Sequence, residues 1–244
     1  MPNTNELPLQ VETGINTFVE AAKTAFGSNL VSVVVYGSAA EGRMRATSDV
    51  NMLVVLKAFV QAEADRLREP MRIAHATLDL SAMFILESEV PAAMDAFAVK
   101  FADIVSRHRV LFGSDPFAAV APKRESLIRR LKQVLLNLQL RLRERYVLVS
   151  LREEQLALVI ADAAGPLRSS AATLLQLEGQ SALAPKEALE KIVREMGNEN
   201  LVTALHDVSV AREERQLGPG KAAPTLIAII EITQKLRERT DKLA

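Results

Sequence analysis

The chain has 244 residues, 49% of them hydrophobic, and its 30 basic side chains balance its 30 acidic ones. The length predicts one or two domains, the apolar content excludes a disordered chain, and the balanced charge argues against a protein that mainly coats nucleic acid, because phosphate neutralisation needs an excess of Lys and Arg. The chain has no cysteine, which excludes disulfides, thiolate metal sites and cysteine nucleophiles.

The sequence gives no sign of export or of a membrane span. Its first residues lack the basic start and apolar run of a secretory signal, and no uncharged apolar stretch approaches the roughly 18 residues of a membrane helix. The three histidines, His75, His108 and His206, lie far apart, which argues against a histidine-rich zinc site. We therefore expect a cytoplasmic protein with no membrane partner.

The first quarter of the chain predicts a helix, two strands and a second helix. Apolar residues at helical spacing predict a helix over Val11–Phe26. Two β-branched apolar runs, Leu30–Tyr36 and Val50–Leu56, predict strands buried on both faces. A further helix over Ala58–Arg68 is expected to end before Pro70.

The next segment predicts a third strand and a long helix. Alternating residues from His75 to Leu86 indicate a strand. The polar face of this strand is predicted to carry Thr77, Asp79 and Ser81. Pro91–Phe112 is expected to be helical and to end at Gly113, a residue favoured at left-handed caps. His108 is then interpreted as a residue that caps the helix end.

From residues 117–122 onward the composition changes, and no convincing strand follows. Leu-, Ala- and Arg-rich periods predict about five helices that form a bundle. The expected helices are Lys123–Leu151, Glu153–Glu178, Pro185–Met196, Glu199–Gln216 and Pro224–Leu243. We therefore expect an α+β protein with one domain over residues 1–118, built on a mixed sheet with flanking helices, and an all-α domain over residues 119–244.

The most informative stretch runs from Val33 to Leu56. A buried strand ends in Gly37-Ser38, an irregular connection follows, and Ser48-Asp49-Val50-Asn51 opens the next strand. A glycine lets the backbone approach a phosphate closely, and the adjacent serine offers hydroxyl and amide donors to it. Residues two apart on a strand share a face, so acidic groups at positions 49 and 51 could bind divalent ions beside a phosphate.

This order of residues resembles the signature of the nucleotidyltransferase superfamily related to DNA polymerase beta. In that family Gly-Ser is followed some ten residues later by Asp-x-Asp entering a strand. The segment Arg107–Phe117 also resembles the one that closes the nucleotidyltransferase domain in many bacterial relatives, and a helical domain follows it in antibiotic-modifying members. The resemblance implies transfer of a nucleoside monophosphate from a Mg²⁺-bound nucleoside triphosphate to a hydroxyl of a small molecule, a protein or an RNA.

The chain departs from the family pattern at the second acidic position. Asp49 fills the first, but the second is Asn51, whose amide oxygen is a weaker Mg²⁺ ligand than a carboxylate. The resemblance implies a third acid from a later strand, and Asp79 matches best, with Glu87 or Glu89 as alternatives. The expected metal ligands and catalytic groups are therefore Asp49, Asn51 and Asp79.

Basic residues outside this motif have a functional and a structural interpretation. Arg43 and Arg45 lie in the connection, where either could contact a triphosphate or be a solvated charge; we include Arg43 with Gly37 and Ser38 in the expected nucleotide site. The basic face of Lys123–Leu151 indicates either a solvated helix face or a contact for an acceptor or RNA. Tyr36 is expected to belong to the core.

Two functions of different classes follow. The first is a nucleotidyltransferase that uses Mg²⁺, a nucleoside triphosphate and a hydroxyl acceptor. The second, motivated by Asn51, is a catalytically degenerate nucleotidyltransferase fold that binds nucleotide or a protein partner, with an antitoxin-like role as a specific version. A protein partner or a homo-oligomer is a further expectation that is not tied to either function.

Overall fold

The computed structural model describes residues 7–42, 44 and 48–243. These residues divide into two compact units. The first comprises the residues up to Ala96 together with Phe101–Pro122, and the second comprises Phe97–Lys100 together with the residues from Lys123 onward.

The first unit is built on a four-stranded mixed sheet with the strand order β3-β2-β1-β4. Its strands are β1 (Leu30–Tyr36), β2 (Val50–Leu56), β3 (Leu80–Leu86) and β4 (His108–Gly113). β1 is antiparallel to both β2 and β4, whereas β2 and β3 run parallel. The expected β1 and β2 are confirmed to the residue, because both are buried β-branched runs with abrupt ends.

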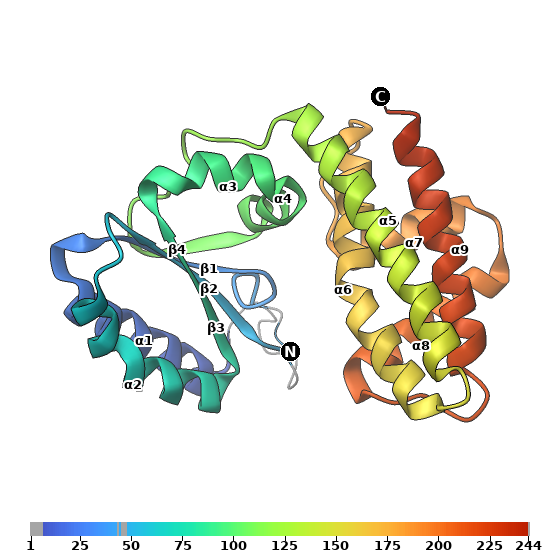
Figure 1. Ribbon diagram of the computed structural model, residues 1–244, viewed down its shortest axis with the longest axis horizontal. Coiled ribbons are helices and arrows are strands. Elements are labelled where there is room, and N and C mark those ends of the chain that lie inside the picture. Colours follow the sequence, from blue (N-terminus) through green and yellow to red (C-terminus); the bar gives the residue numbers. More distant parts are fainter. Residues whose placement is uncertain (1–6, 43, 45–47, 244) are drawn as a thin grey trace, which may run out of the picture. The chain divides into compact units, whose positions relative to one another are not determined.

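Helices cover both faces of this sheet (Figure 1). One face packs against α1 (Leu9–Phe26) and α2 (Gln61–Leu78), and its core includes Phe18, Val33 and Met52. The other face packs against α3 (Val90–Ala96) and α4 (Ala98–Ser106), and its core includes Val34 and Leu53. Alternate residues of β1 and β2 therefore enter different cores, as the two-residue period of a strand requires.

The expected end of the second helix before Pro70 is wrong, because α2 continues to Leu78. Leu67, Met71, Ala74 and Leu78 lie on one helical stripe that packs against the core on both sides of the proline. Burial of this stripe outweighs the backbone hydrogen bond that proline removes. The predicted third strand is consequently shorter than expected, since residues 75–78 belong to α2.

The expected single helix over Pro91–Phe112 is also wrong. The segment forms α3, α4 and the edge strand β4, so Gly113 follows a strand and not a helix. A Cβ atom at Gly113 would lie 2.0 Å from the Val31 carbonyl oxygen, and the residue has φ +77°. Only glycine can therefore occupy this position, where β4 approaches the backbone of β1.

The second unit is a five-helix bundle, as predicted, with helix ends within two residues of expectation. Its helices are α5 (Arg124–Val149), α6 (Glu153–Leu177), α7 (Pro185–Glu195), α8 (Glu199–Glu214) and α9 (Ala222–Asp241). α6 packs against the other four helices and is the most extensively buried of the bundle. Together with the mixed sheet, the bundle confirms the α+β fold class.

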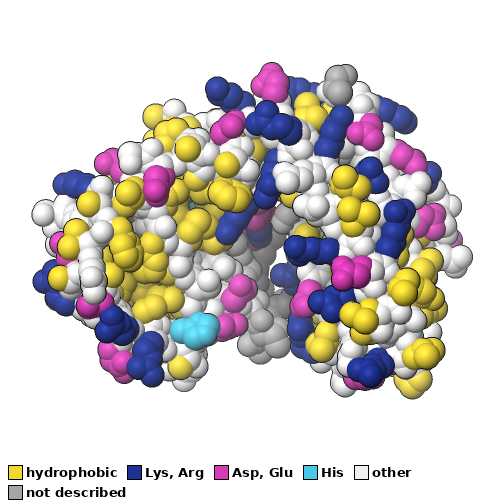
Figure 2. Space-filling model, in the orientation of Figure 1, with side chains coloured by type: hydrophobic (Ala, Val, Ile, Leu, Met, Phe, Trp, Pro, Cys, Tyr) yellow, Lys and Arg dark blue, Asp and Glu magenta, His cyan; other side chains and the backbone are white. Residues whose placement is uncertain are grey.

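The polar surface of the bundle is held by ion pairs between helices. Arg239 binds Glu178 through two nitrogens, at 2.5 and 2.6 Å, and Glu195 at 2.7 Å. On the basic face of α5, Lys132 pairs with Asp241 at 3.3 Å. Positive and negative side chains are intermingled on the face drawn in Figure 2.

In the described part of the chain, no helix combines the length and the apolar character needed to cross a membrane.

Candidate functional site

A row of polar side chains crosses the sheet where β1 ends and β2 begins. This polar row consists of Ser81, Asn51, Tyr36 and His108. Each member is paired with the next across neighbouring strands, so all four lie on one face of the sheet. The same face carries Val34 and Leu53, which belong to the core under α3 and α4. The row therefore lies at one end of the sheet, on the α3 and α4 side.

Asp49 and Asn51 form a hydrogen-bonded pair at this end of β2. The Asn51 Nδ2 atom donates to the Asp49 Oδ2 atom over 2.8 Å, and Asp49 is exposed to solvent. A carboxylate at position 51 would repel Asp49, whereas the amide donates to it. The pair thus carries a single negative charge.

Tyr36 packs against the core under α3 and α4, as its sequence context predicted, and it also belongs to the polar row. It is half-buried and pairs with Asn51 on one side and His108 on the other. Burial raises the pKa of the Tyr36 phenol above its usual value of 10.0, and the negative charges of Asp49 and Asp103 raise it further. Tyr36 is therefore a neutral hydrogen-bond donor at neutral pH.

The expected phosphate-binding residues lie in a compact turn, Gly37–Gly42, that follows β1 directly; we call it the glycine–serine turn. Gly37 has φ +76°, and its carbonyl accepts hydrogen bonds from the amides of Ala40 and Glu41 at 3.1 and 3.3 Å. The Gly37 amide donates to the Arg107 carbonyl over 2.9 Å. Among the described residues, neither the hydroxyl nor the amide of Ser38 has a hydrogen-bond partner. The two donors of Ser38 are therefore not engaged by the described part of the chain.

A cluster of three charged side chains, missed in the sequence, holds this turn. Arg107 binds Asp103 through Nε at 3.1 Å and Nη2 at 2.6 Å, and its Nη1 lies 3.2 Å from the Glu41 carboxylate. Burial alone would lower the pKa of Arg107, but its hydrogen bonds to Asp103 and the charges of Asp103 and Glu41 raise it above its ordinary value. The four-residue spacing of Asp103 and Arg107 is one at which side chains on a helix can pair, so this contact could have been predicted. Glu41 lies 66 positions from Arg107, and no local pattern indicates that they meet.

Asp79 lies at the same end of the sheet as Asp49, but not on a strand. It precedes Leu80, which pairs with Val50, and Asp49 precedes Val50. The residue caps α2 in the left-handed conformation, with φ 47° and ψ 39°, and its carboxylate lies 4.0 Å from the His75 ring nitrogen. The expectation that Asp79 shares a strand face with Thr77 and Ser81 is therefore wrong, because the helix extends to Leu78.

The alternatives Glu87 and Glu89 follow β3 at its far end. Seven strand residues separate them from the Asp49 end, or about 23 Å at 3.3 Å per residue. The Glu89 carboxylate accepts a hydrogen bond from the Leu86 amide over 2.9 Å. Neither residue can share a metal ion with Asp49.

His108 does what its sequence context predicts, although from a strand. Its Nδ1 atom lies 2.9 Å from the Val105 carbonyl in the last turn of α4, and its Nε2 atom lies 3.3 Å from the Asp115 carboxylate. The imidazole thus caps α4 and ties it to the segment after β4. Arg43 and Arg45 lie outside the described residues.

The residues present fit one magnesium ion better than a resident pair. Mg²⁺ is usually bound by one or two carboxylates together with substrate phosphates and water. Asp49 offers one carboxylate, and the neighbouring positions of the polar row hold an amide and a hydroxyl. Within the described ranges, no group of three or more acidic, His or Cys side chains lies close enough together to bind a metal ion. The donor set therefore suits an ion that arrives with phosphates.

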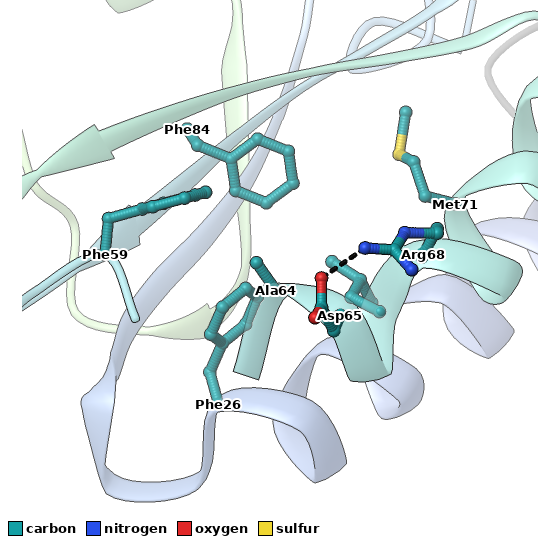
Figure 3. Close-up of a pocket in the computed structure, with 8 residues that line it drawn as sticks. Phe26, Phe59, Ala64, Asp65, Arg68, Met71 and Phe84 are labelled. Carbon is teal, nitrogen blue, oxygen red and sulfur yellow. Dashed lines mark hydrogen bonds and ion pairs between the residues drawn. The ribbon is translucent and has the colours of Figure 1, made fainter. Parts of the chain in front are cut away.

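A separate pocket of about 240 Å³ lies near the other end of β2 and β3, between α1, α2 and β3. Figure 3 shows three phenylalanine rings around it, from Phe26, Phe59 and Phe84, with the Asp65–Arg68 ion pair beside them. The ring centroids of Phe26 and Phe84 are 6.2 Å apart. This pocket is mostly apolar and shares no residue with the polar row or the glycine–serine turn.

The sequence matches no protein-family model and no curated protein. Among solved structures, the chain is similar to the spectinomycin adenyltransferase AAD(9) from Enterococcus faecialis, determined with ATP and spectinomycin. The TM-score is 0.63 at 11% identity, and the match covers 94% of this chain and 99% of the adenyltransferase. This similarity confirms the expected nucleotidyltransferase-like fold with its helical second part.

Proposed function

We propose that this protein binds a nucleoside triphosphate, as its complex with one Mg²⁺ ion, at the glycine–serine turn and the adjacent polar row. The observation that carries the proposal is the arrangement after β1 and before β2. Ser38 keeps two donors without a partner in the described chain, and Asp49 presents an exposed carboxylate at the same end of the sheet. A phosphate group would find hydrogen-bond donors at Ser38, and the metal ion that accompanies it would find a carboxylate at Asp49.

Each residue has a separate task in this proposal. Gly37 adopts a positive φ that lets the turn follow β1 directly, and Ser38 donates to phosphate oxygens. Asp49 ligates the ion, and Asn51 orients the Asp49 carboxylate by donating to it. The ion, when bound, neutralises phosphate charge.

The charges around the turn make binding depend on the metal ion. Glu41, Asp49 and Asp103 are acidic, and Arg107 is already paired with two of them. A polyphosphate alone would be repelled, because like charges at short range disfavour binding. We therefore expect no measurable nucleotide binding without Mg²⁺.

Nucleotidyl transfer to a hydroxyl acceptor is the first use of the bound nucleotide that we propose. Its support is the similarity, over nearly the whole of both chains, to an adenyltransferase whose structure holds ATP and a small molecule. A small-molecule hydroxyl is accordingly the first acceptor class to test, before a protein or an RNA. Asp79, at the same end of the sheet as Asp49, stays our proposal for a further acidic group on the acceptor side.

Nucleotide binding without transfer is the second candidate. The hydrogen bond from Asn51 to Asp49 favours it, because an amide donating to a carboxylate replaces a second acidic ligand. In this version the bound nucleotide would act as a signal. It would control the binding of a protein partner, as in an antitoxin, or of a second copy of the chain.

Calorimetric titration with non-hydrolysable analogues of the four nucleoside triphosphates, with and without Mg²⁺, tests the proposal. We expect binding of at least one analogue, and only with Mg²⁺. Absence of binding by all four with Mg²⁺ present would overturn it. Incubation with α-labelled nucleotide and hydroxyl compounds, with pyrophosphate release as the readout, then separates the two candidates.

A further inference from the structure

Arg107 contacts the glycine–serine turn at two points. It is the single residue between α4 and β4. Its backbone carbonyl accepts the hydrogen bond from the Gly37 amide, and its Nη1 atom binds the Glu41 carboxylate. One residue therefore fixes both ends of the turn that contains Ser38.

The guanidinium group is itself held in place. Asp103, one helical turn earlier in α4, accepts two hydrogen bonds from it. The side chains of Arg107, Asp103 and Glu41 are 20%, 21% and 26% exposed. Partly buried, bidentate ion pairs are less screened and better ordered than surface pairs. The cluster thus links the turn to a helix that is anchored in the core by Phe101 and Ile104.

We propose that Arg107 is a positioning residue that fixes the glycine–serine turn so that the donors of Ser38 face a bound nucleotide. This inference rests on the proposed nucleotide binding. In this scheme Arg107 does not contact the nucleotide, because each of its three guanidinium nitrogens already donates to Asp103 or Glu41. Nothing in the sequence motif pointed to this role.

The main test compares Mg²⁺-dependent nucleotide binding in three variants. Arg107→Ala should weaken binding by about tenfold to a hundredfold, since it removes charge-assisted hydrogen bonds. Arg107→Lys, which keeps the charge but not the bidentate geometry, should recover part of the loss. Arg109→Ala is the matched control, because Arg109 lies two residues later with an exposed side chain and should bind as the wild type does. Titrations are run well below the lowest unfolding temperature of the set.

If Arg107 acted only through its positive charge, the variants would show a different pattern of nucleotide affinities. Arg107→Ala leaves Glu41 and Asp103 without a cation, which would also repel phosphate. We therefore add Arg107→Ala/Glu41→Gln/Asp103→Asn, which removes the repulsion but not the defect in the turn. If Arg107 acts by positioning the turn, this triple variant should still bind nucleotide weakly. Recovery of wild-type affinity would overturn the inference.

Hydrogen exchange of peptides covering residues 37–42 measures the turn without any nucleotide. We expect faster exchange in Arg107→Ala than in Arg109→Ala or the wild type, with other peptides of the sheet unchanged. Unchanged exchange, or nucleotide affinity within twofold of the wild type in Arg107→Ala, would overturn the inference. Failure of the wild type itself to bind nucleotide would instead overturn the proposed function, while the exchange experiment would still decide whether Arg107 fixes the turn.

Discussion

The two ends of β2 differ in chemistry although the strand between them is almost fully buried. At its start, Asn51 is the only polar residue of the strand and donates to Asp49 beside Tyr36. After its end, the chain reaches Phe59 and the apolar pocket under α2. One strand therefore supports two surfaces of different chemistry, and the nucleotide site that we propose uses the one that carries Asp49 and Asn51.

The largest expected effect at the polar end comes from Asp49→Ala. This variant removes the exposed carboxylate of the pair, and we expect nucleotide affinity in the presence of Mg²⁺ to fall by about a hundredfold or more, the equivalent of one strong charge-assisted contact. Calorimetric titration measures it. Asp65→Ala, at the other end of the strand and also exposed to solvent, is the control and should leave affinity unchanged. Equal affinity of Asp49→Ala and the wild type would remove Asp49 from the site.

Adding carboxylates to the polar row should strengthen Mg²⁺ binding at this end of β2. Asn51→Asp places a second carboxylate beside Asp49, and we expect Mg²⁺ affinity to rise by about tenfold. Asn51→Asp/Ser81→Asp adds a third at the paired position of β3 and should raise it further. Without Mg²⁺ both variants should unfold at a lower temperature than the wild type, because like charges repel. Unaltered Mg²⁺ affinity would show that position 51 does not face a metal site.

Tyr36 predicts a pH dependence of stability at the polar end. Because its pKa is raised in the folded protein, first by burial and then by Asp49 and Asp103, the unfolded chain loses the phenol proton first. The contribution of the Tyr36 phenol to the free energy of unfolding is therefore complete below pH 10. It is lost as the pH rises through the folded-state pKa. Denaturant unfolding of wild type and Tyr36→Phe at pH 8, 10 and 11 should show a steeper loss in the wild type. If the free energy of unfolding fell equally with pH in the wild type and in Tyr36→Phe, this prediction would be wrong.

The smallest effect is expected from Phe59→Ala at the apolar end. The Phe59 side chain is 62% exposed, so its loss should cost less than about 1 kcal/mol of unfolding free energy. Nucleotide affinity should not change. A loss of affinity as large as that of Asp49→Ala would show that the two ends are coupled through the sheet.

The sequence predicted those parts of the fold that depend on local patterns. β1 and β2 were found because each is a continuous β-branched apolar run with abrupt ends, and the five bundle helices were found because each keeps a helical hydrophobic period over several turns. β4 was missed, since His108–Gly113 is a short edge strand that pairs with β1, a strand remote in sequence. The division near residue 118 into two domains stays a prediction.

The candidate site was predicted only as far as its linear motif. Gly37, Ser38, Asp49 and Asn51 are near one another in sequence, and the structure brings them to one end of the sheet. The cluster of Glu41, Asp103 and Arg107 depends on long-range packing of α4 against the turn. Asp79 was placed on a strand because helical and alternating patterns overlap between residues 75 and 80.

Gly37 and Gly113 share a positive φ but differ in what surrounds them. A side chain at position 37 would meet open space, whereas one at 113 would collide with the Val31 carbonyl. In a saturation library, asparagine, which tolerates left-handed backbone better than most residues, should survive at position 37 and be eliminated at 113. Natural variation could therefore change the turn that we propose faces the nucleotide, whereas the position of β4, and with it the Arg107 carbonyl, depends on the absence of a side chain at Gly113.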